Sequence, residues 1–273
     1  MNIALLPDRA VLEISGEDRL AFLQGLISND VTKVRADQAI WAALLTPQGK
    51  WLADFFLIAT GDVLLLDAEA GQLAMLAQRL GRFRLRAKVA LQDASADWRV
   101  YAAWGEAAVP AGLAARDPRL PEAGWRVLAP AGLPTNASAE DYAAHRIGLG
   151  LPDGSKDMEA EKSVLLEGGF DELNGISWTK GCYMGQELTA RTRYRGLLKR
   201  RLVPVAIEGP APERGTPIMT PDGAEAGEMR SSQGAQGLAL LRLERLDKGA
   251  LAAGGARLTP QPPSWMKLPE PKA

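Results

Sequence analysis

The sequence is poor in the residues that build disulfides and soft-metal sites. Its 273 residues include one cysteine, Cys182, and one histidine, His145. A single cysteine cannot form an intrachain disulfide. One cysteine with one histidine can neither complete a usual zinc site nor hold an iron–sulfur cluster alone. We therefore predict no metal site within this chain, and any cluster is shared with another subunit or sits on a client protein.

Long apolar runs and an excess of charge of one sign are also missing. Lysine and arginine number 32 against 33 aspartate and glutamate residues, which gives a net charge of −1. A near-neutral chain is not drawn as a whole to nucleic acid or to a membrane. No segment has the length and apolarity of a membrane span, and the first residues lack the pattern of a secretion signal. We expect a cytoplasmic monomer in a reducing compartment, without membrane or direct nucleic-acid contact.

Several stretches predict β-structure. Residues 40–45, 51–59 and 63–67 are apolar runs joined by short turns, which predicts an antiparallel meander. After Leu202, short apolar runs alternate with turns rich in proline and glycine, which predicts a small β-barrel. Residues 260–273 are expected to form a tail, with Trp265 as its anchor.

The one cysteine lies in the segment Lys180-Gly181-Cys182-Tyr183-Met184-Gly185-Gln186-Glu187. Glycines on both sides permit a tight turn on which a ligand can approach the thiol. Gln186 and Glu187 fall where a helix would begin, and a helix N-terminus together with Lys180 favours the thiolate. We predict a reactive Cys182. The alternative is a small buried residue, because free cysteine is among the most buried types.

This segment, followed by Arg191, resembles the signature of the YgfZ-type proteins. These proteins are relatives of the glycine-cleavage T-protein, an aminomethyltransferase, and act in folate-linked biogenesis and repair of iron–sulfur clusters. The continuation Gln186-Glu187-Leu188-Thr189-Ala190-Arg191-Thr192 is most similar to the branch that includes the mitochondrial iron–sulfur assembly factors. The resemblance implies that Cys182 is a transient cluster ligand or redox partner. It also implies tetrahydrofolate as cofactor, and cluster-assembly proteins or client iron–sulfur enzymes as partners.

Asp54 is the second candidate for a catalytic residue. It interrupts an apolar strand, so its charge either faces solvent by alternation or is buried with a partner. The block Pro47-Gln48-Gly49-Lys50, followed by Asp54-Phe55, resembles the part of the aminomethyltransferases that carries an active-site aspartate. That resemblance places Asp54 near the reacting nitrogen of folate, where a carboxylate would stabilise developing positive charge.

The resemblance also implies which residues surround a bound folate. These cofactor-binding positions are Lys180, Gly181, Tyr183, Gln186, Glu187, Arg191, Asn29 and Tyr142. Asn29 is otherwise a helix-stop residue. Tyr142 is placed to stack on a pterin ring, or is an ordinary helix residue with a wet hydroxyl. At Gly148 the folate-binding relatives commonly carry a glutamate that pairs with the pterin. Glycine cannot accept those hydrogen bonds, which argues against tight pterin binding.

Basic and apolar residues alternate in the segment Arg82-Phe83-Arg84-Leu85-Arg86-Ala87-Lys88-Val89. On a strand this alternation would put the four cations on one face and the apolar side chains toward the core. Such a strand is either a solvated sheet face or a strip that binds anions, such as a polyglutamate tail or an RNA backbone.

The resemblance covers most of the chain and implies an α+β fold. Residues 1–198 would form a two-lobed, T-protein-like folate-binding region of antiparallel sheets with helices, with its two lobes interleaved. Residues 199–273 would form the C-terminal β-barrel and tail. The function implied is a folate-linked factor that uses Cys182 to assemble or repair iron–sulfur clusters on client enzymes, and enzymes of tRNA processing fall within that range. Two alternatives stay open: a tetrahydrofolate-dependent aminomethyltransferase, and a non-catalytic docking module for cluster-carrying proteins.

Overall fold

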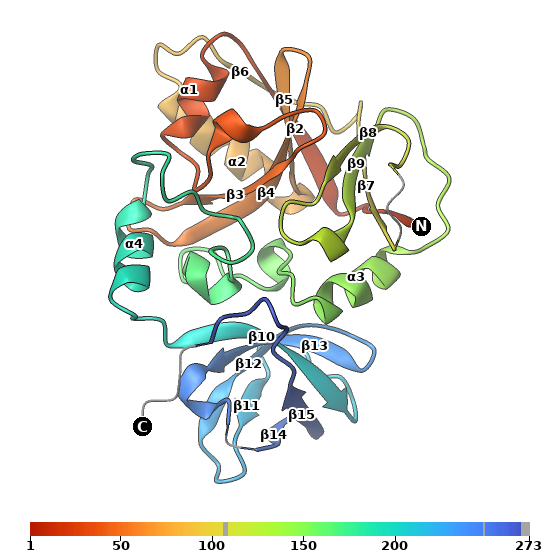
Figure 1. The fold of residues 1–273 in the computed structure, drawn as a ribbon, viewed down its shortest axis with the longest axis vertical. Coiled ribbons are helices and arrows are strands. Elements are labelled where there is room, and N and C mark those ends of the chain that lie inside the picture. The colour runs from red at the N-terminus through yellow and green to blue at the C-terminus, as the bar shows by residue number, and fades with distance from the viewer. Residues whose placement is uncertain (106–108, 248, 269–273) are drawn as a thin grey trace.

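The computed structural model describes residues 1–105, 109–247 and 249–268. Two antiparallel sheets with helices beside them form the larger part of the molecule, and a closed β-barrel forms one end of it (Figure 1). The predicted α+β architecture with a C-terminal barrel is confirmed.

The first lobe is built on a five-stranded sheet. In their order across the sheet, the strands are β3 (Ile40–Leu45), β4 (Trp51–Thr60), β5 (Val63–Glu69), β2 (Arg9–Ser15) and β6 (Ala90–Asp93). The first three are consecutive and antiparallel, so the predicted meander is confirmed. Helices α1 (Arg19–Gln24) and α2 (Ala70–Phe83) pack on this sheet. α2 buries Leu73, Leu76 and Leu80, which lie on one face because they are three and four residues apart.

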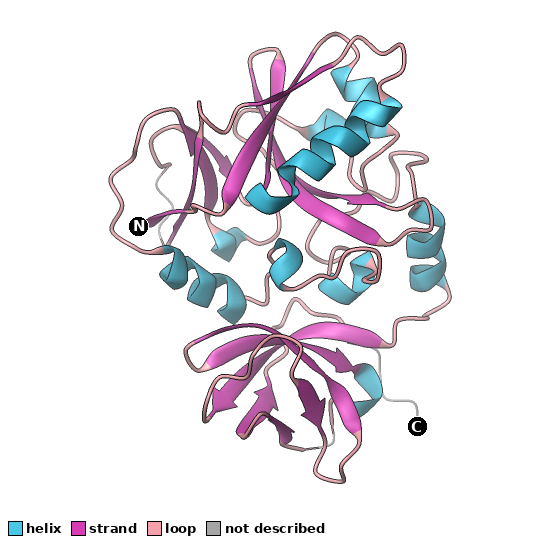
Figure 2. Ribbon diagram, turned by 180° about the vertical axis from the view of Figure 1, so that it is seen from behind, coloured by secondary structure: helices cyan, strands magenta, loops and turns pink. Residues whose placement is uncertain are grey.

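The second lobe is built on a four-stranded sheet. Its strands, in order, are β1 (Asn2–Leu5), β7 (Arg99–Trp104), β9 (Trp125–Ala129) and β8 (Leu113–Arg116). Successive strands β1 and β2 enter different sheets, so the two lobes are interleaved. Helix α3 (Ala139–Gly148) begins at a capping box in which the Ser138 and Asp141 side chains bond each other's backbone N–H. α3 then lies between this lobe and the barrel (Figures 1 and 2).

Residues 149–199 form a long connecting segment between α3 and the first strand of the barrel. The connecting segment contains the short helices η3 (Gly154–Lys156) and η4 (Leu165–Gly168) and helix α4 (Gln186–Tyr194). Two further short helices lie in the lobes: η1 (Val31–Lys33) follows α1, and η2 (Pro121–Ala123) precedes β9. Within the connecting segment, Leu165, Phe170 and Leu173 are fully buried against Trp41 and Trp51 of the first sheet. Within the described ranges, no helix has the length and apolarity needed to cross a membrane.

The barrel closes on itself. In order around it, the strands are β10 (Arg200–Glu208), β13 (Gln236–Arg242), β12 (Glu225–Gln233), β11 (Pro217–Met219), β14 (Leu251–Ala253) and β15 (Ala256–Pro260), and η5 (Leu243–Arg245) follows β13. Val203, Val205 and Ile207 alternate into its core. Beyond β15, Trp265 donates its indole N–H to the carbonyl of Leu149 (2.9 Å) and anchors the tail as predicted. The last part of the predicted tail, residues 269–273, lies outside the described residues.

The predicted basic strand at residues 82–89 is wrong. Helix α2 continues to Phe83, a turn follows, and the next strand begins only at Ala90. The helical spacing of the α2 leucines extends the helix through the first of the alternating residues. Leu85, expected in the core, is 90% exposed.

Candidate functional site

Cys182 lies on an exposed loop directly before α4. The helix begins at Gln186, as the sequence predicts, and Gly185 precedes it with a left-handed backbone (φ 81°). The side-chain oxygen of Gln186 accepts a hydrogen bond from the backbone N–H of Tyr183 (3.1 Å), which fixes the turn between the cysteine and the helix. The alternative of a buried cysteine is therefore wrong, whereas the reactivity of Cys182 stays a prediction.

Lys180 ties this loop to the segment that follows α1. Its ammonium group donates to the carbonyls of Ile27 and Asn29, each at 2.7 Å. On the other side of the cysteine, the backbone N–H of Met184 donates to the carbonyl of Gly25 (3.0 Å). Burial lowers the pKa of Lys180 to about 8, because it disfavours the charged ammonium. Lys180 therefore holds the cysteine loop against the segment that follows α1.

Two glycines allow the cysteine loop to pack closely against the β3–β4 turn. A Cβ on Gly185 would lie 2.5 Å from the carbonyl oxygen of Thr46 and 3.0 Å from the Cα of Gly49. A Cβ on Gly49 would lie 2.6 Å from the carbonyl oxygen of Gly185. Real Cβ atoms do not approach other atoms this closely, so both positions require glycine. The two segments that carry the sequence resemblance therefore touch backbone to backbone.

The buried side chain of Asn29 links three segments next to the cysteine loop by hydrogen bonds. Its side-chain amide donates to the carbonyls of Trp41 (2.8 Å) and Asn174 (2.7 Å), and its side-chain oxygen accepts from the backbone N–H of Asp30 (2.8 Å). Both amide N–H groups are therefore used within the chain. A contact of Asn29 with folate stays a prediction.

The remaining predicted residues of this loop differ in exposure, because the Tyr183 side chain is buried in the core and Gln186 is half-buried. Glu187 and Arg191 are exposed and lie one helical turn apart on α4. Gly181 has a left-handed backbone (φ 95°), with open space where a Cβ would be. The structure therefore gathers most of the predicted residues at one place, namely Asn29, Lys180, Gly181, Cys182, Tyr183, Gln186, Glu187 and Arg191.

Asp54 is not part of this exposed site. It is only 3% exposed, and its carboxylate accepts hydrogen bonds from the indole N–H groups of Trp41 (2.9 Å) and Trp51 (3.2 Å). Burial raises the pKa of Asp54 to about 6, against the opposing effect of the Trp41 hydrogen bond. Trp41 stacks on Phe170 with ring centroids 3.8 Å apart. Of the two alternatives for Asp54, the buried carboxylate with a partner is the one observed.

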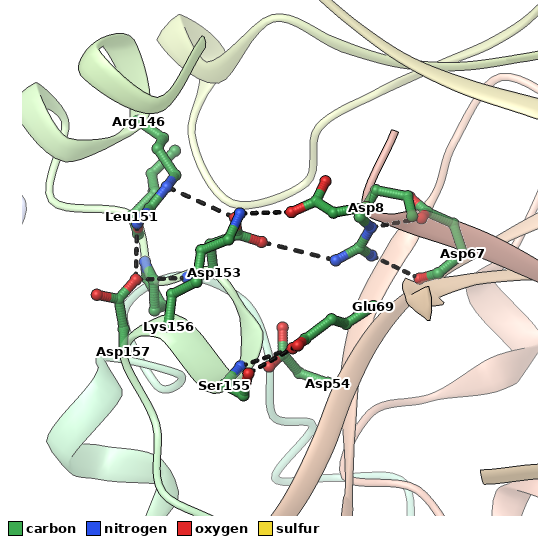
Figure 3. Close-up of polar contacts among 12 residues, drawn as sticks. Asp8, Asp54, Asp67, Glu69, Arg146, Leu151, Asp153, Ser155, Lys156 and Asp157 are labelled. Atoms are coloured by element: carbon green, nitrogen blue, oxygen red, sulfur yellow. Dashed lines mark hydrogen bonds and ion pairs between the residues drawn. The ribbon is translucent and has the colours of Figure 1, made fainter. Parts of the chain in front are cut away.

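A network of buried ion pairs lies beside Asp54 (Figure 3). Arg9 pairs with Asp67 of β5 (2.7 Å), and Arg146 of α3 pairs with Asp157 (2.7 Å). Asp153 lies between the two arginines, 3.6 Å from Arg9 and 3.7 Å from Arg146. Although burial opposes it, Arg146 together with nearby cations holds the pKa of Asp153 well below its usual range.

Sequence reasoning missed this network. Its one local signal is Asp67, a charge that ends an apolar run as Asp54 interrupts one. Its other members come from distant segments and carry no common pattern. The network ties both lobes to the connecting segment, and this role is structural.

A cavity of about 280 Å³ opens next to the network. Tyr142, Arg9, Arg146 and Lys156 are among its lining residues, whereas Asp54 is not. Tyr142 is itself buried, and its hydroxyl accepts a hydrogen bond from Arg119 (3.3 Å), so its hydroxyl is not wet. α3, which carries Tyr142, and α4, which follows Cys182, lie on opposite sides of the molecule (Figures 1 and 2). The structure therefore does not bring Tyr142 to the cysteine site.

The residues at the implied folate position do not fit an open pterin site. The Asp54 carboxylate is closed off from solvent and already bonded to two indole groups. Gly148 has no acceptor side chain, and the space beside its Cα is occupied by the Gln236 side chain of the barrel (3.2 Å from an added Cβ). A ligand at Asp54 would therefore have to displace packed aromatic side chains.

Comparison with known proteins relates this chain to one family of proteins and to one known fold. Residues 199–268 match the family described as CAF17, C-terminal beta-barrel domain. The chain is 35% identical over 300 residues to the mitochondrial iron-sulfur cluster assembly factor IBA57 of Homo sapiens, covering 95% of this chain and 84% of that protein. It is 33% identical to the Mus musculus protein, covering 90% and 78%. It is also 35% identical to the mitochondrial IBA57 homolog of Mycosarcoma maydis over 76% of this chain, and spans 57% of that relative's length.

A solved structure shares the fold. The crystal structure of glycine cleavage system aminomethyltransferase T from Bartonella henselae superposes with a TM-score of 0.73, covering 98% of this chain and 86% of that chain. The sequence identity is 12%, so the likeness shows the T-protein fold alone.

The predicted cytoplasmic localisation is contradicted, because these relatives are mitochondrial proteins. The prediction depended partly on the single cysteine. A free cysteine indicates that no disulfide is required, and it does not select among compartments that keep thiols reduced.

The relatives carry the name IBA57 rather than YgfZ, the related family whose signature the cysteine segment resembles. Their similarity extends over most of both chains for the human and mouse proteins, through the lobes and the barrel alike. This chain therefore belongs to the IBA57 family of iron–sulfur cluster assembly factors.

Proposed function

We propose that this protein takes part in the assembly of iron–sulfur clusters and that Cys182 contacts the cluster directly, as a transient ligand. The observation that carries the proposal is an exposed cysteine on a loop held in place on both sides. Lys180 clamps the loop before the cysteine, and the contact between Gly185 and Gly49 locks it afterwards. A thiol held in this way meets a partner without the entropic cost of ordering a mobile loop.

Cys182 can supply only one of the ligands that a cluster needs. Iron–sulfur clusters are held mostly by four cysteine thiolates, and this chain has one cysteine. The other ligands come from the protein that carries the cluster, so the cluster is cargo rather than a resident cofactor. Exchange of one partner thiolate for the Cys182 thiolate leaves the oxidation states of iron and sulfide unchanged. The step therefore needs no oxidant or reductant.

The test compares Cys182→Ala with Thr179→Ala, a change at an exposed neighbour in the same loop. Each full-length variant is mixed anaerobically with a cluster-loaded scaffold protein, and visible circular dichroism reports the ligand environment of the cluster. The wild type and Thr179→Ala should change the spectrum, whereas Cys182→Ala should not.

An unchanged response of Cys182→Ala would overturn the ligand role. If that variant also promoted transfer of the cluster to an apo-enzyme as well as the wild type, the protein would be a docking module without a ligating residue. The aminomethyltransferase alternative has the T-protein fold in its favour, but the closed environment of Asp54 supports no transfer step there.

Tetrahydrofolate binding stays a prediction, and no step of the proposed function depends on it. Titration with reduced tetrahydrofolate, followed by tryptophan fluorescence and calorimetry, tests it. Binding that weakens in Asp54→Ala would show that the aromatic cluster opens to admit a pterin. Binding that weakens only in Tyr142→Ala would place the ligand in the cavity beside α3.

A further inference from the structure

The turn after α2 presents two apolar side chains between cations. We name residues 82–88, Arg82-Phe83-Arg84-Leu85-Arg86-Ala87-Lys88, the basic tip. Leu85 is 90% exposed and Phe83 is 42% exposed, although both are residues that a folded chain normally buries. The cations on either side of them are exposed as well. Neighbouring exposed apolar side chains with a rim of charged residues are typical of interaction sites.

The backbone holds Leu85 outward at a conformational cost. Its φ of 43° lies in the left-handed region, which disfavours branched side chains. The turn is nevertheless closed by hydrogen bonds from the N–H of Ala87 to the carbonyl of Arg84 (2.7 Å) and from the N–H of Lys88 to the carboxylate of Asp18 (2.7 Å). The fold thus keeps Leu85 both strained and exposed, and backbone strain of this kind is commonest at functional sites.

The charge of the basic tip is only partly neutralised. Lys88 pairs with Glu17 (2.8 Å). Among the described residues, neither Arg82 nor Arg86 forms an ion pair, and the guanidinium of Arg84 donates only to the backbone carbonyl of Val89 (3.5 Å). The near-neutral charge of the whole chain therefore conceals a local excess of positive charge at this turn.

The position of the basic tip leaves it open to a large flat surface. It lies beside the start of α1, where Gly16 packs against the carbonyl of Lys88, at the end of the molecule opposite the barrel (Figure 1). Leu20 of α1, 38% exposed, belongs to the same end. A side chain that is nine-tenths exposed has no groove around it. Exposed apolar side chains flanked by cations suit the interface of an anionic bilayer, where the apolar groups can insert and the cations meet the headgroups.

The expectation of no membrane contact came from the net charge of the whole chain and does not apply to this local surface. We propose that the basic tip docks this protein onto the surface of an anionic lipid bilayer. Leu85 and Phe83 enter the boundary between headgroups and acyl chains, and Arg82 and Arg86 contact the lipid phosphates. The combination of projecting apolar side chains and flanking cations matches the two contributions that bind proteins to such surfaces. The barrel then points away from the membrane.

The test measures sedimentation of the full chain with vesicles of phosphatidylcholine and phosphatidylglycerol, compared with phosphatidylcholine alone. We expect binding to the mixed vesicles that weakens with salt. Arg82→Gln combined with Arg86→Gln should reduce partitioning by roughly 30-fold. Leu85→Asn should reduce it by about tenfold, because it removes the apolar group. Asparagine tolerates the left-handed backbone, so this variant keeps the turn.

Matched controls come from the exposed residues around the end of α4. Leu197→Asn, at a side chain 46% exposed, and Arg195→Gln combined with Lys199→Gln should leave partitioning unchanged. Equal binding to neutral vesicles, equal losses in the controls, or no loss in Leu85→Asn would overturn the proposal. Binding to poly-L-glutamate without binding to vesicles would also overturn it, and would assign the basic tip to an acidic protein partner.

Discussion

Asp54→Asn tests whether the buried carboxylate costs stability at neutral pH. Burial raises the pKa of Asp54 to about 6 in the folded chain, and an aspartate in an unfolded chain titrates near ~3.9. The unfolded state therefore loses this proton first as the pH rises. Stability contributed by protonated Asp54 is fully present below about pH 4 and is lost as the pH rises through about 6.

The magnitude follows from the size of the shift. About two pKa units correspond to about 3 kcal/mol in the free energy of unfolding, lost by the wild type across this window and retained by Asp54→Asn. The substitution has a second effect that does not depend on pH. Asparagine offers one acceptor oxygen, so one of the two indole N–H groups loses its partner at a cost of about 1–3 kcal/mol.

The assay is urea unfolding of the wild type and Asp54→Asn at a series of pH values from about 4.5 to about 8. The difference between the two curves should change by about 2 kcal/mol in favour of the variant, since part of the titration lies below this range. Asp62→Asn, at a fully exposed side chain in the β4–β5 turn, is the control and should run parallel to the wild type. Parallel curves for Asp54→Asn would refute the reasoning.

Two further predictions concern packing and the buried ion pairs. Gly185→Ala should lower the free energy of unfolding by at least about 2 kcal/mol, because its left-handed backbone adds to the clash with Thr46, whereas Gly181→Ala in open space should cost only about 1 kcal/mol. Equal losses in urea unfolding would show that the contact with the β3–β4 turn is not tight. Arg146→Met should cost about 3–5 kcal/mol in thermal unfolding, because it leaves the buried carboxylate of Asp157 unpaired. A small loss, comparable to that of an exposed arginine, would contradict this role.

What the sequence predicted correctly depends on local patterns. The meander follows from apolar runs joined by short turns, and the start of α4 at Gln186 follows from the polar residues after the second glycine. The barrel follows in the same way from short runs and turn residues. The basic strand failed because alternation over a few residues is a weaker signal than the helical spacing of α2, which continues into it.

What could not be predicted depends on contacts between distant segments. The sequence showed that Asp54 is unusual but not that two tryptophans would donate to it. Asp153 and Arg146 are unremarkable charges until the fold encloses them. The left-handed backbone of Leu85 is likewise set by the hydrogen bonds that close its turn, and its own residue type gives no hint of it.

The interleaving of the two lobes has a consequence for synthesis on the ribosome. β1, the first strand made, pairs with β7, which begins only at Arg99, while β2 pairs with the later strands β5 and β6. The barrel, by contrast, closes among strands between Arg200 and Pro260. A nascent chain that stalls before β7 therefore holds its opening strand without its native partner, and that unpaired strand is open to aggregation or to capture by a chaperone.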